Sequence, residues 1–175
     1  LEQDAPSNAY WGYIHGHTEL SDGTGSLDNY FTCIRDGCGL DFGALGDHDH
    51  VRETSPAMWE MAQEATARYH EDGTFVTFLG YAWAKWRKNG DGDRNVYYLS
   101  DGRPMYRSGE DHYPNPDALF DALENERAIV IPHHTAEIGN HCDFKDHGPK
   151  AERLIEIFSV WGNSERSVHD GNPYP

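Results

Sequence analysis

The sequence has few basic residues and no long apolar run. Lys and Arg together number 14 against 30 Asp and Glu, which gives a formal net charge of −16. Phosphate backbones and anionic lipid surfaces are bound mainly through Lys and Arg, so this balance argues against a nucleic-acid-binding protein and a membrane-surface protein. Because no run of 18 apolar residues is present, we do not expect a membrane-spanning helix.

Cysteine is also scarce. The three cysteines (Cys33, Cys38 and Cys142) lack the spacing of zinc ligands, and an odd number cannot form a complete disulfide framework. We therefore expect small buried side chains at these positions. The high acidity suits a salty or extracellular setting, so an extracytoplasmic or periplasmic location is favoured over a cytoplasmic one.

The chain has enough residues for one domain and a regular alternation of predicted elements. Its 175 residues contain no Pro/Ser-rich linker, which indicates a single domain. Strands are predicted over residues 9–14, 41–45, 75–83, 95–99, 128–131 and 154–158. Helices are predicted to begin after the capping residues Ser26, Ser55 and Asn115. The alternation predicts an α/β fold with mostly parallel strands.

Histidine is abundant for so acidic a chain, with 11 residues, and several of them follow predicted strands. These positions are His15 and His17, then Asp47, His48, Asp49 and His50, and finally His133 and His134. The carboxyl ends of parallel strands meet at one edge of a sheet, so we expect these side chains to converge. Imidazole and carboxylate groups are common metal ligands, and the pattern therefore predicts a metal site.

The spacing of His15 and His17 adds to this prediction. In a strand, residues i and i+2 point to the same side, so both imidazoles could reach one ion. Asp22 could supply an oxygen ligand from the next loop. The simpler alternative is two unrelated surface histidines.

One basic cluster stands out in the acidic chain: Lys85, Arg87, Lys88 and Arg94. It has two interpretations, a solvated hairpin tip or an anion clamp at the rim of the metal site that would suit phosphate. Arg94 is the stronger candidate for the clamp because it lies at the start of a predicted strand.

Two longer stretches resemble a known family. Residues 10–25 (YWGYIHGHTELSDGTG) and 40–50 (LDFGALGDHDH) are similar to the PHP superfamily, named for polymerase and histidinol phosphatase, and above all to its DUF3604 branch. Shorter matches are GYAW at 80–83, GDRNV at 92–96, PHH at 132–134, IEIFS at 155–159 and GNSE at 162–165.

The resemblance implies a distorted (β/α)7 TIM-like barrel that binds one to three divalent ions, zinc, manganese or iron, and hydrolyses phosphate esters. By position, His15 and His17 would bind one metal, and Asp22 and His48 another. His133 or His134 would help to bind a third. His15, His17 and His48 would thereby be catalytic, and Arg94 would stabilise developing charge.

Three departures from the family pattern qualify this expectation. Ala82 stands where the family has a Glu that bridges two metals, and its loss should weaken at least one ion. Asp93 replaces a His, which would make it a harder ligand. The family's final Asp-x-His motif is absent, so we expect residues 1–175 to form one PHP-like domain without its last barrel strand. A second chain or another copy of this chain could supply the missing part.

The leading hypothesis from sequence is a metal-dependent phosphoesterase that acts on a small phosphorylated substrate. The first alternative is a metal-binding pseudoenzyme or ligand-binding module, inactivated by Ala82 and by the missing motif. The second alternative is a structural or interaction module whose histidines have no common role.

Overall fold

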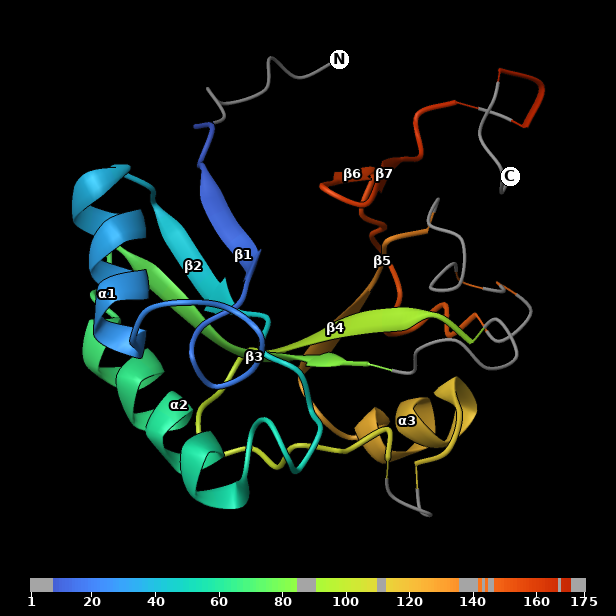
Figure 1. The fold of residues 1–175 in the computed structure, drawn as a ribbon, viewed down its shortest axis with the longest axis horizontal. Helices are drawn as coiled ribbons and strands as arrows, with labels where there is room; N and C mark the ends of the chain where they lie inside the picture. The colour runs from blue at the N-terminus through green and yellow to red at the C-terminus, as the bar shows by residue number, and fades with distance from the viewer. Residues whose placement is uncertain are drawn as a thin grey trace, which may run out of the picture.

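A curled, five-stranded sheet forms the centre of the computed structural model (Figure 1). The structure describes residues 8–84, 91–109, 113–135, 142, 144, 147–166 and 168–170. In spatial order the strands are β1 (Gly12–Gly16), β2 (Phe42–Leu45), β3 (Val76–Trp83), β4 (Asp93–Tyr98) and β5 (Ala128–His133). A separate antiparallel ribbon consists of β6 (Phe158–Ser159) and β7 (Gly162–Asn163).

The sheet is mixed, and this overturns the predicted fold class. Strands β1, β2 and β3 pair in parallel, whereas β4 is antiparallel to both β3 and β5. The described residues therefore form a half-barrel, not a (β/α)7 barrel or a mostly parallel sheet. Part of the reason lies in residues 84–92, which join β3 to β4: a parallel crossover needs about a dozen residues or more, so this short connection reverses the chain.

Three α-helices and a short 3₁₀ helix (Val168–Asp170) occur in the part of the chain that the structure describes. The α-helices are α1 (Leu27–Thr32), which continues as a π-helical stretch (Cys33–Gly37), α2 (Pro56–Tyr69) and α3 (Pro116–Leu123). The three α-helices begin after Ser26, Ser55 and Asn115. The side-chain oxygen of each of these residues accepts a hydrogen bond from the backbone N–H three positions later. The predicted caps are thus confirmed. None of these helices has the length and apolar character to cross a membrane.

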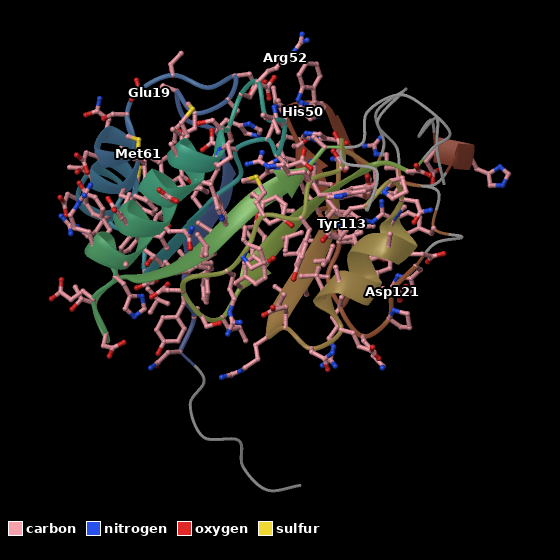
Figure 2. All side chains as sticks on the ribbon, turned by 90° about the horizontal axis from the view of Figure 1, so that it is seen from below. Glu19, His50, Arg52, Met61, Tyr113 and Asp121 are labelled. Atoms are coloured by element: carbon pink, nitrogen blue, oxygen red, sulfur yellow. The ribbon has the colours of Figure 1, made fainter. Side chains whose placement is uncertain are left out.

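The two faces of the sheet differ in what covers them. One face packs against the helices through a large apolar core that includes Phe31, Trp59, Tyr81 and Leu119. The other carries a smaller cluster of Ala44, Tyr97 and Ile131, with Ile14, Phe78 and Ile129 packed against it. Figure 2 shows the labelled Met61 of α2 and Asp121 of α3 on opposite sides of the molecule, with His50 and Arg52 at the rim between them.

The segment after β5 departs from prediction as well. It runs beside β5, because Val130 N–H donates to Ala151 O and Glu156 N–H donates to Pro132 O, each at 3.0 Å. Yet residues 154–157 lie in no strand, and Phe158 begins the short exposed strand β6, so the predicted buried strand over 154–158 is wrong. The apolar side chains Leu154, Ile155, Ile157 and Phe158 are between 43% and 69% exposed. No layer packs over them within the described residues, so their apolar character does not bury them.

Candidate metal centre

The direction of the strands brings the predicted ligands to one edge of the sheet. Because β4 reverses the chain once and β5 reverses it again, β1, β2, β3 and β5 all point the same way. Their carboxyl ends therefore share an edge, and β4 begins at that edge. Two groups of potential ligands meet there: His15 with His133 and His134, and His17 with Asp22 and His48. In each group one ligand atom per residue lies within 4.8 Å of the others.

The first group joins the two outer strands of the sheet. The ring centroid of His15 lies 4.2 Å from that of His133 and 4.9 Å from that of His134. The β1–β2 register is irregular between Tyr13 and Gly16, the stretch that contains His15. His134 has a φ of +51°, which is uncommon for a residue other than glycine.

His133 supplies the test of whether these residues fit a metal ion. Its side chain is almost wholly buried, and its Nδ1 has no hydrogen-bond partner in the part of the chain that the structure describes. Burial lowers the pKa of His133 well below its usual value, and the neighbouring His15 and His134 lower it further. A buried polar atom without a partner carries a desolvation cost, which a bound cation would offset. The residues therefore fit a divalent metal ion.

The second group is held by a loop that folds back onto Asp47. This buried carboxylate accepts hydrogen bonds from Thr18 N–H at 2.8 Å and from Ser21 Oγ at 2.7 Å. The loop thereby places Asp22 Oδ1 2.9 Å from His17 Nδ1 and 3.8 Å from His48 Nδ1. Asp47, predicted only as part of the cluster after β2, thus organises the loop from a buried position.

Several of the histidines are held in the neutral form that can coordinate a metal. Burial lowers the pKa of His17, and the nearby His48 lowers it further. Burial and the neighbouring His15 lower the pKa of His134 to about 4. A neutral imidazole offers a lone pair, so these side chains need lose no proton to bind an ion near neutral pH.

The grouping of the ligands differs from the sequence prediction. His15 and His17 were expected to share one ion because of their i, i+2 spacing. The strand ends at Gly16, however, and the two rings lie 5.7 Å apart between their centroids, each in a different group. His133 and His134 both belong to the group of His15, so the structure presents two adjacent groups of three.

Asp93 and Arg94 do not join either group. Asp93 is the register partner of His133 across β4 and β5, so its backbone lies at the site edge. The next residue faces the opposite side of the sheet: Arg94 Nε donates to Glu152 Oε1 at 2.7 Å, and both side chains are buried. The structure therefore does not place Arg94 at the metal centre as an anion clamp. Lys85, Arg87 and Lys88 lie outside the described residues.

The site opens into a pocket of about 530 Å³. Its lining includes five of the six potential ligands, together with the apolar or aromatic side chains of Tyr13, Phe158, Val160 and Trp161. Neither Lys nor Arg occurs among the described residues that line it. An anionic ligand in this pocket would therefore depend on bound cations for charge compensation.

Comparison with known families agrees with part of the sequence prediction. Residues 41–169 match the family DUF3604, whose description is a protein of unknown function. The chain belongs to the DUF3604 family. Membership of the wider PHP superfamily stays a prediction.

Curated relatives of this DUF3604 chain come from chlamydiae and are uncharacterised proteins. The chain is 26% identical to one from Chlamydia pneumoniae over 172 residues, 98% of this chain and 28% of the relative. It is 27% identical to one from Chlamydia muridarum over 165 residues, 94% of this chain and 26% of the relative. The chain thus spans between a quarter and a third of the length of these relatives.

One solved structure shows a distant likeness. It is the crystal structure of a candidate metal-dependent phosphoesterase from Bifidobacterium adolescentis, with 21% identity and a TM-score of 0.37. The likeness covers 65% of this DUF3604 chain and 36% of that chain.

Two carboxylates at the DUF3604 site were not among the predicted site residues. Glu156 Oε2 lies 2.5 Å from His15 Nδ1, and Glu53 Oε2 lies 2.9 Å from His48 Nδ1. Burial raises the pKa of Glu156, but the hydrogen bond with His15 and the charge of that residue outweigh it and leave the pKa below its ordinary value. The motif at 155–159 contains Glu156 and could have pointed to it. Nothing in the sequence separates Glu53 from other surface acids.

Proposed function

We propose that this DUF3604 chain carries the metal centre of a phosphoesterase that hydrolyses small phosphate esters. The observation that carries the proposal is the pair of adjacent ligand groups, His15, His133 and His134 beside His17, Asp22 and His48. Two neighbouring divalent ions are a common arrangement for phosphate-ester hydrolysis, because together they can stabilise both the attacking and the leaving oxygen.

The donor set favours ions of intermediate softness. Five imidazoles and one carboxylate suit zinc, manganese or iron better than calcium or magnesium, which prefer all-oxygen sites. A bound divalent ion would supply Lewis acidity, lower the pKa of water and offset the charge of a phosphate group. The unpartnered Nδ1 of buried His133 supports a bound cation at this position.

The chain's own residues would form the pocket for the ester and hold the ions that bind its phosphate group. The pocket admits a ligand from solvent, and its described lining offers no basic side chain that competes with metal ions for the phosphate. Asp22 is 64% exposed at the pocket wall, so it can approach an ion from the solvent side. The motifs around His15 and His48 resemble those of PHP phosphoesterases, and this resemblance supports phosphate-ester hydrolysis as the reaction.

The test is metal-dependent turnover by untagged protein. Metal should be removed with a chelator and restored as zinc, manganese or iron(II), with p-nitrophenyl phosphate and bis-p-nitrophenyl phosphate as substrates. We expect turnover that depends on added metal and falls at least about 100-fold in His17→Ala and in His133→Ala. His70→Ala is the matched control, because His70 lies outside both ligand groups and should keep the activity.

One observation favours an alternative, a metal-binding protein without hydrolytic activity. Ala82 is fully buried, and its backbone pairs with that of His48 in an isolated parallel β-bridge. A Glu at this position, as in the family pattern, would therefore approach the site. If the unaltered chain binds metal but turns over neither ester, the same assay on Ala82→Glu decides between the two. Turnover gained by Ala82→Glu would establish the alternative, and turnover by the unaltered chain would exclude it.

A further inference from the structure

Two glutamates contact candidate ligand histidines through the same ring nitrogen. Glu156 reaches His15 Nδ1 at 2.5 Å, and Glu53 reaches His48 Nδ1 at 2.9 Å. Both carboxylates are partly buried, with 17% and 29% of the side chain exposed. The contacts fall in different ligand groups. In the second group Glu53 is the nearer carboxylate to His48 Nδ1, because Asp22 Oδ1 lies farther away, at 3.8 Å.

The chemistry of a carboxylate fixes the proton on the histidine. An ionised carboxylate can only accept hydrogen bonds, so the Nδ1 that faces it must carry the proton in the neutral imidazole. The lone pair then lies on Nε2. This tautomer coordinates metal through Nε2, and a carboxylate behind the ring is a common way to orient a ligand histidine and strengthen it as a donor.

We propose that Glu53 and Glu156 are positioning residues of the metal centre, which set His48 and His15 as Nε2 donors, one in each ligand group. The role of the two donors rests on the proposed metal centre, whereas the tautomers do not require that the centre hydrolyses anything.

Glu156 also contacts a second candidate ligand of its group, whereas the other histidine near Glu53, His50, belongs to neither group. Glu156 Oε1 accepts the backbone N–H of His134 at 3.3 Å, and its own N–H donates to Pro132 O at 3.0 Å. The same carboxylate therefore orients His15 and supports the uncommon backbone conformation of His134. Its replacement should disturb two ligands of one group, so we expect a larger effect from Glu156 than from Glu53.

The first experiment reads the tautomers directly in the metal-free protein. Long-range ¹H–¹⁵N spectra distinguish the two neutral forms of each histidine, and single His→Gln variants assign the signals. We expect His15 and His48 as Nδ1–H tautomers near pH 8, with a shift toward a mixture in Glu156→Gln and Glu53→Gln respectively. Nε2–H tautomers for both histidines in the unaltered protein would overturn the proposal, whatever the variants do.

The second experiment measures metal affinity by isothermal titration with zinc or cobalt(II). We expect about 10- to 100-fold weaker binding in Glu156→Gln and a smaller loss in Glu53→Gln. Glu124→Gln is the matched control, because this exposed carboxylate at the end of α3 lies outside both ligand groups, 3.6 Å from Lys150 Nζ, and its loss should leave metal binding unchanged. Affinity equal to the control in both variants would overturn the positioning role.

The outcomes separate this inference from the proposed function. Expected tautomers and weakened metal binding without any ester turnover would reject the phosphoesterase and support the positioning role. Metal-dependent turnover that is unchanged in Glu53→Gln and Glu156→Gln, with unchanged affinity, would support the phosphoesterase and reject the positioning role.

Discussion

Arg94 shows how much the surroundings of a single residue decide its role. Its guanidinium is fully buried, donates to Glu152 Oε1 and to the carbonyls of Asp91 and Gly92, and lies 5.9 Å from the centroid of the Phe120 ring. A charge in such a place is tolerated because it is paired. Removing one partner leaves the other charge buried, which makes the pair a strong requirement of the folded state.

We predict that Arg94→Met lowers the free energy of unfolding by about 3 kcal/mol, because Glu152 would be left buried without its main partner. The matched control is Arg68→Met, since Arg68 pairs with Asp28 at the surface, where both side chains are more than half exposed, and should cost less than about 1 kcal/mol. Urea unfolding followed by circular dichroism measures both. If the two variants are equally stable and only Arg94→Met has a raised KM for the ester, Arg94 binds the anionic substrate and the structural role is wrong.

The placement of Arg94 could have been anticipated from residues already singled out. Side chains alternate between the faces of a strand, so a ligand role for Asp93 on β4 implies that Arg94 faces the other side. Adjacent residues of one strand cannot both face the metal site. Glu152, by contrast, lies 58 residues away, and no local pattern indicates that it is the partner.

At the level of elements, the loop between β1 and α1 sets the second ligand group. Gly23 N–H donates to Thr18 O at 3.1 Å, and the turn closes so tightly that a Cβ at position 23 would lie 2.2 Å from His17 O. The backbone carbonyl of His17, one candidate ligand, thus packs against Gly23, which directly follows Asp22, another candidate ligand. A side chain larger than hydrogen at this position must open the turn.

We predict that Gly23→Ala separates Asp22 from His17, weakens the binding of one ion at least about 10-fold and lowers stability by about 1–3 kcal/mol through overpacking. Gly109→Ala is the control, because a Cβ there meets nothing within 4 Å. Isothermal titration with zinc should show one weakened site in Gly23→Ala and two unchanged sites in Gly109→Ala. Two unchanged sites in Gly23→Ala would contradict the assignment of the loop.

The elements themselves were predictable to different degrees. The helix starts at Ser26, Ser55 and Asn115 follow from local chemistry, since each side-chain oxygen accepts a hydrogen bond from the backbone N–H of the residue three positions later. The reversal of β4 depends on pairing partners, which the alternation of strands and helices does not specify. The exposure of residues 154–158 depends on whether a further layer covers them, and a local apolar pattern cannot report that.

At the scale of the whole molecule, the first ligand group brings together residues from the two edge strands of the sheet. His15 belongs to β1 and His133 to β5, which are the two outer strands, and the Tyr97 hydroxyl of β4 donates to Ile14 O across the curled face. A metal ion in this group would therefore tie the two edges of the half-barrel together. His15, His17, His48, His133 and His134 lie at one edge even though the sheet is mixed, because the second reversal at β5 restores the direction of β1.

We predict that zinc raises the stability of the metal-free protein, because an ion bound only by the folded chain shifts the unfolding equilibrium. At a free concentration 100 times the dissociation constant the gain is about 2.7 kcal/mol, visible as a rise in Tm in thermal unfolding with and without chelator. His133→Ala should lose most of this gain, since it removes the buried ligand from β5, whereas His70→Ala should keep it. A full gain in His133→Ala would show that the stabilising ion binds elsewhere, and that the two edges of the sheet are held without it.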